Sequence, residues 1–136
     1  MKSLNFILSV IVLLGLSISC SARPGEKAGR SRISGADVVD MFYFHNTRRC
    51  VTCRAVEKES EAIVKELYNK KVVFTAYNLE EEDGKAKAEE LGVSGQTLLI
   101  VSGDIRINIT NEAFMYARSK PEKLKQVIKE KIDPLL

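Results

Sequence analysis

The sequence predicts an α/β sandwich: one mixed sheet of four strands flanked by three to four helices. Segments rich in β-branched and aromatic residues alternate with segments whose apolar residues recur at helical spacing. Such alternation is typical of parallel strands joined by right-handed crossovers. Further along the chain, two strand-like segments flank a Ser-Gly-Asp turn, which predicts a hairpin and an antiparallel edge.

Composition narrows the class of protein further. The chain has 136 residues, of which 45% are hydrophobic and 29% charged, so a disordered chain is excluded. Its length suits a single domain of about 100–150 residues. Lys and Arg total 21 against 18 Asp and Glu, and the net charge of +3 argues against a nucleic-acid partner. Three cysteines and one histidine favour cysteine chemistry over a multi-histidine metal site.

Residues 1–19 read as a signal peptide, because Lys2 is followed by an apolar run and then by small residues. That run is shorter than the ~20 residues of a membrane span, so a retained anchor helix is the weaker alternative. The segment ending Leu16-Ser17-Ile18-Ser19-Cys20 resembles a bacterial lipobox, in which Cys20 is lipidated. The alternative is ordinary cleavage after Ala22. Either way we expect export to a compartment where disulfides persist.

A flexible tether is expected over residues 20–36, and the folded domain over residues 37–136. The segment 21–36 holds three glycines, three serines and a proline, a composition typical of linkers. Residues 38–44 then read as a strand buried on both faces, 51–68 as a helix and 71–79 as a second strand. Asp83 is the expected cap of a short helix that runs to Leu91 and ends at Gly92.

The hairpin is predicted from strands at residues 97–101 and 105–109. Ser119 and Glu122 match a capping box at the start of the final helix. That helix places four apolar residues on one side: Leu124, Val127, Ile128 and Ile132.

The strongest chemical signal is Cys50-x-x-Cys53, which lies between the first strand and the first helix. A helix N-terminus carries partial positive charge and free N–H groups, both of which stabilise a thiolate. Three fixed cations, Arg48, Arg49 and Arg54, surround the motif. A free thiol of pKa ~8.5 can fall to roughly 3.5–7.5 in such surroundings. We therefore expect Cys50 to be substantially ionised at neutral pH.

Helical geometry separates the roles of the two cysteines. At about 100° per residue, Cys53 lies in one arc of about 80° with four residues that form the core-facing stripe. These four are Val56, Ser60, Ile63 and Leu67. Cys50 lies off the stripe, where a partner can reach it. Cys50 is therefore the candidate nucleophile and Cys53 the candidate resolving thiol.

Three other interpretations of the cysteines compete with a redox pair. A purely structural disulfide would close a very small loop and stabilise little. A metal site could recruit His45, but structural zinc takes four protein ligands and the chain has no second C-x-x-C and no other histidine, so no metal is expected. Inert cysteines in a binding module are the third alternative. No cofactor is expected, since no flavin or nicotinamide motif is visible.

Other polar and aromatic features have simpler expected roles. The run Glu80-Glu81-Glu82-Asp83 is expected to be a solvated loop leading into a helix cap, with an acidic docking patch as the alternative. His45 is expected to cap or line the loop before the cysteines. Tyr77, Phe114 and Tyr116 are expected to pack rather than to bind a ligand.

Taken together, these segments resemble the thioredoxin fold over roughly residues 37–133. The resemblance rests on a buried strand, a C-x-x-C that opens a helix, a strand ending Tyr77-Asn78-Leu79 and the segment 90–100. More narrowly, residues 43–54 with their Arg-Arg-Cys-x-Thr-Cys-Arg core resemble the nitrophenyl compound nitroreductase subunit (ArsF-type) family. Members of that family are small exported proteins typical of Bacteroides-like, Gram-negative bacteria.

The resemblance implies that Cys50 and Cys53 are a redox pair and that Gln96 and Thr97 belong to a substrate loop. Thioredoxins have a cis-proline where Gln96 stands. A cis bond before Gln96 would cost about 2.5–4 kcal/mol, so a trans bond is expected. The buried aspartate of thioredoxins is replaced by Tyr43 or Phe44. These departures argue against a general reductase and favour a dedicated partner.

The function predicted from the sequence is thiol–disulfide exchange in the cell envelope, passing two electrons to or from a dedicated protein partner. The protein is expected in the periplasm or on a membrane through a lipid anchor. The narrower resemblance implies an accessory subunit of a nitroreductase-type system, with the reducing cofactor on another polypeptide. The alternative is a redox-inert thioredoxin-fold module that binds a partner protein, a soft metal or a metalloid.

Overall fold

The computed structural model describes residues 38–136. The expected signal peptide, the tether and the lipidation site Cys20 lie outside the described residues. The described part contains no helix long and apolar enough to cross a membrane.

Strands and helices alternate along the first half of this region, as predicted. The strands are β1 (Val39–His45), β2 (Val72–Asn78), β3 (Thr97–Ser102) and β4 (Ile105–Asn108). The helices are α2 (Val51–Tyr68), α3 (Glu82–Leu91), α4 (Thr110–Tyr116) and α5 (Pro121–Ile132), followed by a short 3-10 turn, η1 (Asp133–Leu135). The bounds of α2 match the prediction, and the strands differ from it by one residue at most ends.

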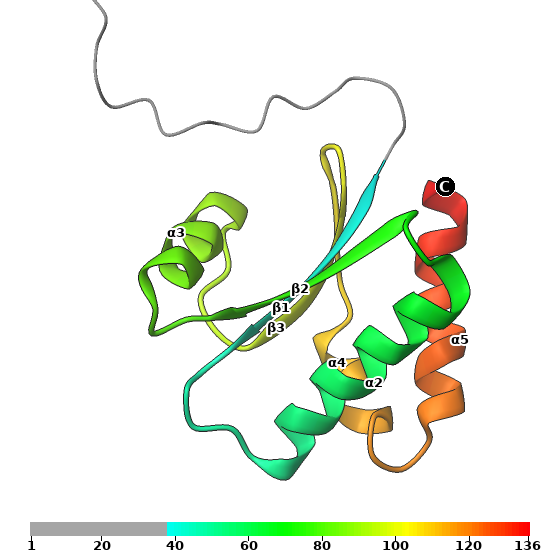
Figure 1. The fold of residues 1–136 in the computed structure, drawn as a ribbon, viewed down its shortest axis with the longest axis horizontal. Coiled ribbons are helices and arrows are strands. Elements are labelled where there is room, and N and C mark those ends of the chain that lie inside the picture. The colour runs from blue at the N-terminus through cyan, green and yellow to red at the C-terminus, as the bar shows by residue number, and fades with distance from the viewer. Residues whose placement is uncertain (1–37) are drawn as a thin grey trace, which may run out of the picture. The chain divides into compact units, whose positions relative to one another are not determined.

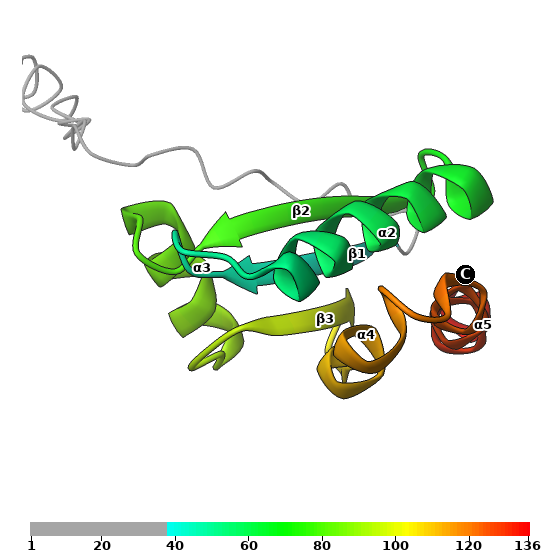
Figure 2. The same cartoon turned by 90° about the horizontal axis from the view of Figure 1, so that it is seen from below.

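The four strands form one mixed sheet in the order β2-β1-β3-β4. The central strand β1 pairs in parallel with β2 and antiparallel with β3, and β3 continues antiparallel to β4. Figure 2 shows β1 and β2 running in the same direction and β3 in the opposite one. The predicted four-stranded mixed sheet is confirmed.

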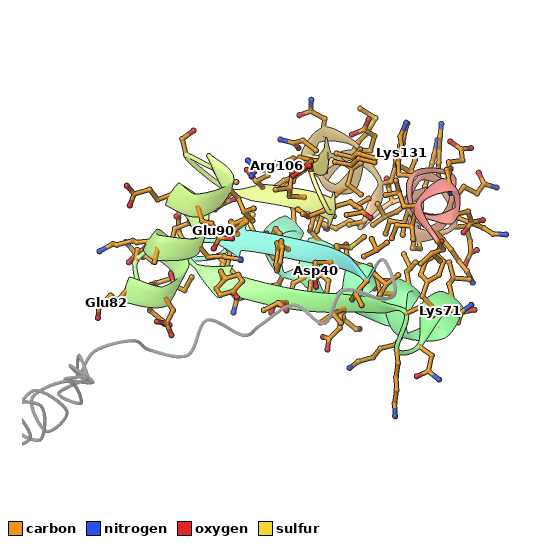
Figure 3. The ribbon with its side chains drawn as sticks, turned by 90° about the horizontal axis from the view of Figure 1, so that it is seen from above. Asp40, Lys71, Glu82, Glu90, Arg106 and Lys131 are labelled. Carbon is orange, nitrogen blue, oxygen red and sulfur yellow. The ribbon has the colours of Figure 1, made fainter. Side chains whose placement is uncertain are left out.

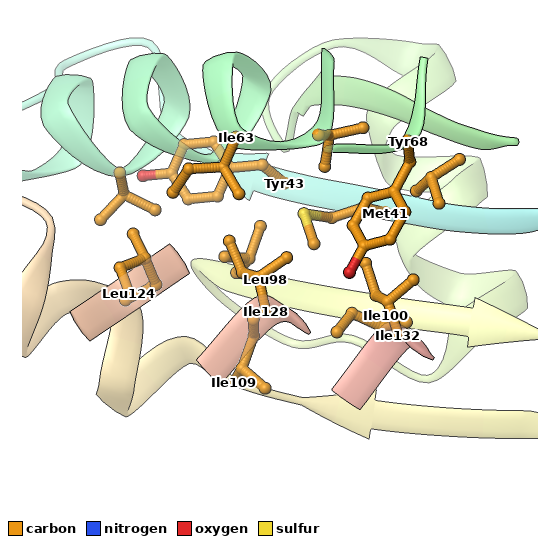
Figure 4. Close-up of a cluster of buried hydrophobic side chains, with 14 of the residues drawn as sticks. Met41, Tyr43, Ile63, Tyr68, Leu98, Ile100, Ile109, Leu124, Ile128 and Ile132 are labelled. Carbon is orange, nitrogen blue, oxygen red and sulfur yellow. The ribbon is translucent and has the colours of Figure 1, made fainter. Parts of the chain in front are cut away.

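Helices cover both faces of the sheet, so the chain forms two hydrophobic cores. Helices α2, α4 and α5 lie on one side and α3 on the other (Figure 1). Because side chains alternate along a strand, Met41 and Tyr43 enter the first core while Phe42 and Phe44 enter the second. Figure 4 shows the larger core, where Met41 and Tyr43 meet side chains of α2, β3 and α5. Burial on both faces of β1 is confirmed.

The inner face of α2 is close to the predicted stripe. Cys53, Val56, Ser60 and Ile63 are buried, as expected. Leu67 is only half-buried, and Val64 and Tyr68 complete the buried face instead. Charged side chains lie on the outside of the described region, for example Glu82 and Glu90 on α3 and Lys131 on α5 (Figure 3).

Two of the predicted helix caps are wrong. Helix α3 has Glu81 as its N-cap, and Asp83 lies in the first turn, where a carboxylate favours the helix dipole without capping it. Ser119 donates to the carbonyl of Met115 at 3.1 Å, so it is not free to cap α5. That helix begins instead with a proline in its first turn. Gly92 does end α3, in the left-handed conformation at φ 69°.

Helix α4 is an element that the predicted order lacked. Strand β4 stops at Asn108, whose side chain accepts a hydrogen bond from the Thr110 N–H at 3.0 Å. Such an Asx turn changes the direction of the backbone and lets the helix begin directly after the strand. With only seven residues, α4 is too short to produce a clear helical period.

Candidate functional site

Cys50 is the N-cap residue of α2. Its backbone is extended, with φ −72° and ψ 171°, and its Sγ accepts a hydrogen bond from the Cys53 N–H at 3.3 Å. The N-cap position is usually occupied by Ser, Thr, Asp or Asn, whose oxygen satisfies an otherwise unpaired N–H group of the first turn. Here a sulfur has that role, so the first turn of the helix stabilises negative charge on Cys50.

The two cysteine sulfurs lie 2.7 Å apart, and both cysteines are free thiols. They differ in accessibility: Cys50 is exposed, whereas Cys53 is only 4% exposed on the inner face of α2. An external disulfide can therefore contact the Cys50 sulfur directly, whereas the Cys53 sulfur is in contact with Cys50 and is shielded from solvent. This arrangement can form a disulfide with little backbone movement.

The two thiols also differ in acidity. The pKa of Cys50 is lowered, first by the hydrogen bond from the Cys53 thiol and then by backbone N–H groups of the first turn. The pKa of Cys53 is raised, chiefly by burial and then by its hydrogen bond with Cys50. Both shifts have the direction expected from their causes, since donors stabilise a thiolate and burial destabilises one. The thiolate is favoured at Cys50 and the protonated thiol at Cys53.

The three arginines around the motif lie in different surroundings. Arg49 forms an ion pair with Glu57, one helical turn and a half into α2. Arg54 donates to the backbone oxygen of Arg49 at 3.4 Å, and Arg48 is exposed. Their stabilisation of the Cys50 thiolate stays a prediction.

Gln96 lies beside the pair, where the resemblance placed the substrate loop. Its Oε1 is 3.4 Å from the Sγ of Cys53. Thr97 begins β3, pairs with Phe44 of β1, and donates from its hydroxyl to the Gly95 carbonyl at 3.0 Å. No peptide bond in residues 38–136 is cis, as expected for the bond before Gln96.

Tyr43 is a residue of the site that sequence reasoning did not select. Its hydroxyl donates to the backbone carbonyl of Cys53 at 3.1 Å, which ties the first turn of α2 to the central strand. Burial is the main cause that raises its pKa. His45 lines the loop as expected: its Nδ1 lies 3.0 Å from the Asn46 carbonyl and its ring packs against Tyr43.

A clamp of hydrogen bonds holds the loop before Cys50 against the end of β2. Asn78 donates from Nδ2 to the Thr47 hydroxyl at 3.0 Å, and the Thr47 N–H donates to Glu80 Oε1 at 3.0 Å. The Leu79 N–H donates to the His45 carbonyl at 2.7 Å. The acidic run is exposed, as expected for a solvated segment, and Glu80 in addition binds the loop before Cys50. The parallel pairing of the two strands is the signal for this contact, since their carboxyl ends meet at one edge.

A groove of about 540 Å³ lies mainly along α3 and the loop that follows it, and is lined in part by Asn46, Leu79 and Gly95. Neither Cys50 nor Cys53 lines this groove. Within the described region, no three His, Cys, Asp or Glu side chains converge as a metal site would require.

The fold is thioredoxin-like. Its defining features are the four-stranded mixed sheet, the helices on both faces and the C-x-x-C pair at the start of the helix that joins the two parallel strands. No family model matches the chain, and no curated protein matches it either.

Among solved structures, the chain is similar to several thioredoxins. Thioredoxin f2 of Chlamydomonas reinhardtii is 17% identical, with 72% of this chain and 82% of that chain covered and a TM-score of 0.49. The germline-specific thioredoxin Deadhead of Drosophila melanogaster is 18% identical, with 69% and 81% covered and a TM-score of 0.48. Spinach chloroplast thioredoxin f is 22% identical, with 62% and 74% covered and a TM-score of 0.44. These comparisons give no support to the narrower resemblance to the nitroreductase subunit family.

Proposed function

We propose that this protein exchanges thiols and disulfides with a dedicated protein partner through Cys50 and Cys53. One observation carries the proposal: an exposed sulfur of lowered pKa lies 2.7 Å from a buried sulfur at the start of α2. An exposed thiolate can attack an external disulfide, and a buried thiol beside it can complete the exchange.

The reaction proceeds in two displacements. The Cys50 thiolate attacks one sulfur of the partner's disulfide, a mixed disulfide forms, and the partner's other sulfur leaves as a thiolate. Cys53 then loses its proton to water and attacks the Cys50 sulfur. The Cys50–Cys53 disulfide forms as the partner's second thiolate leaves. Two electrons have passed to the partner, and the oxidised pair with a dithiol partner runs the same steps in reverse.

Trapping the covalent intermediate tests this proposal. In Cys53→Ser the second displacement cannot occur, so a mixed disulfide with the partner should accumulate in the cells that make the protein. Cys50→Ser is the matched control and should trap nothing, because the attacking sulfur is gone. If Cys53→Ser traps no partner and Cys50→Ser still binds one, the chain is a redox-inert binding module instead.

The place of action is part of the same proposal. We place the protein in the cell envelope of a Gram-negative bacterium, anchored to a membrane through a lipid on Cys20. Labelled fatty acid should enter the full chain in a bacterial host and should be absent from Cys20→Ala. Equal labelling of both chains would contradict the anchor.

The identity of the partner follows as a separate question. The narrower resemblance implies a nitroreductase-type system, in which the trapped polypeptide would hold the reducing cofactor. The absorbance spectrum of the trapped complex tests that implication, since a flavin partner would give the complex a flavin spectrum. A colourless partner would contradict the nitroreductase link and leave the thiol exchange intact.

A further inference from the structure

The Cys53 thiol has one proton and two neighbouring acceptors. The Cys50 Sγ lies 2.7 Å from the Cys53 Sγ, and the Gln96 Oε1, in the loop before β3, lies 3.4 Å from the same Cys53 Sγ. A thiol can donate only one hydrogen bond at a time. In the reduced protein the Cys50 thiolate is the stronger acceptor, because hydrogen bonds to charged groups are shorter and stronger than those to neutral ones.

The preferred acceptor of the Cys53 thiol changes when Cys50 is bonded to a partner. In the mixed disulfide the Cys50 sulfur is neutral and is a weak acceptor, whereas the Gln96 carbonyl oxygen is unchanged. The second displacement requires Cys53 to lose its proton, and a hydrogen bond from the thiol favours the protonated form. Cys53 is only 4% exposed, so few water molecules can compete for that proton.

We propose that Gln96 accepts the hydrogen bond of the Cys53 thiol while Cys50 is bonded to a partner, and so prolongs the life of the mixed disulfide. Gln96 is a positioning residue in this step: its amide holds the proton on sulfur but cannot remove it. The proton leaves to water, Cys53 attacks Cys50, and the partner departs as a thiolate. This inference rests on the proposed function and gives the site a slow release suited to a dedicated partner.

A chromogenic disulfide measures the two displacements separately. When the reduced full chain reacts with dithiobis(nitrobenzoate), the attack of Cys50 releases one coloured thiolate and the attack of Cys53 releases a second. Gln96→Ala should make the second release about three- to tenfold faster at neutral pH, the size of a typical hydrogen-bond effect. The pH at which the second release reaches half of its maximal rate should be lower in Gln96→Ala than in the unmodified protein. At high pH the second release should be equally fast in both proteins, because Cys53 is then ionised in both. Gln126→Ala, the same change on the exposed face of α5, is the matched control.

A second measurement removes Cys50 from the comparison. In a Cys50→Ser background, the pH midpoint for alkylation of Cys53 should be lower in Gln96→Ala than with Gln96 intact. A purely structural role for Gln96 would change stability without moving either midpoint.

The outcomes separate this inference from the proposed function. If no thiolate is released at all, Cys50 is not a nucleophile and the proposed function fails. If both releases occur but Gln96→Ala leaves the second unchanged or slower, thiol exchange stands and the role of Gln96 is overturned.

Discussion

The carboxylate of Glu80 accepts a hydrogen bond of 3.0 Å from the backbone N–H of Thr47, 33 residues earlier in the chain. Thr47 lies three residues before Cys50, in the loop that leads from β1 into α2. The contact therefore joins the turn after β2 to the segment that sets the position of the attacking sulfur. Asn78 strengthens it from the same side through the Thr47 hydroxyl.

Removing the Glu80 side chain should loosen this loop. In Glu80→Ala the Thr47 N–H is hydrogen-bonded to water instead, so its hydrogen exchange should accelerate. The free energy of unfolding should fall by about 0.5–1.5 kcal/mol. Amide exchange followed by mass spectrometry or NMR measures the first effect, and chemical denaturation the second. Glu82→Ala is the control for the exchange at Thr47, since Glu82 is exposed in the same acidic run. Equal exchange at Thr47 in both variants would show that the clamp does not hold the loop.

Gly84 should be sensitive to the smallest possible substitution. A Cβ at Gly84 would lie 1.9 Å from the carbonyl oxygen of Asn78, so α3 approaches the end of β2 too closely for any side chain. Alanine in place of glycine normally stabilises a helix by about 0.5–1 kcal/mol. In Gly84→Ala the clash should outweigh this gain, so the free energy of unfolding should fall by about 1–3 kcal/mol.

The control for this prediction is another glycine of the same region. A Cβ at Gly95 would meet no atom within 4 Å, so Gly95→Ala should leave the free energy of unfolding almost unchanged. Denaturant unfolding of both variants makes the comparison. Equal stability of Gly84→Ala and the unmodified protein would mean that α3 packs less closely than described.

Alkylation of the reduced protein should modify Cys50 well before Cys53 at mildly acidic pH. The pKa of Cys50 is lowered and that of Cys53 is raised, so as the pH falls below the usual range of a thiol only Cys50 retains a thiolate. Peptide mapping after iodoacetamide treatment across a pH series measures both rates. A Cys50 rate that follows the pH dependence of a free thiol would contradict the assignment.

The arginines should contribute to that reactivity. Replacing Arg48 and Arg49 by Ala removes two cations near the sulfur, so alkylation of Cys50 at low pH should slow. Replacing the exposed Arg118 and Lys131 by Ala, which lowers the net charge by the same two units, is the control for the general effect of net charge. If the double variant and the control react at the same rate, the helix N-terminus and the Cys53 thiol stabilise the thiolate without the arginines.

Two positions on α2 should differ in their contribution to stability. Ile63 is 5% exposed within the larger core, so Ile63→Ala should cost about 2–5 kcal/mol. Leu67 is half-buried at the margin of that core, so Leu67→Ala should cost less than Ile63→Ala. Thermal or denaturant unfolding gives both values. A larger loss at Leu67 would show that the helix face is rotated from the one described.

The local sequence was sufficient to predict the central strand β1, the long helix α2 and the end of α3. The β-branched and aromatic residues of β1 predicted a strand buried on both faces, and the apolar spacing of α2 gave both ends of that helix. Gly92 ended α3 as expected, because only a residue that tolerates the left-handed conformation fits there. The short α4 was missed, since one Asx turn at Asn108 decides where the strand stops.

The sequence by itself placed two cysteines at the start of a helix and separated an outward thiol from an inward one, because helical periodicity is a local property. Only the tertiary structure decided what surrounds them. Tyr43 and Glu80 reach the site from positions 7 and 30 residues away from Cys50, and no local period relates such positions. Gln96, 46 residues away, was expected there only through the resemblance to thioredoxins. These residues meet there because two parallel strands end at the same edge of the sheet and the antiparallel β3 begins at that edge, which brings distant segments to one place.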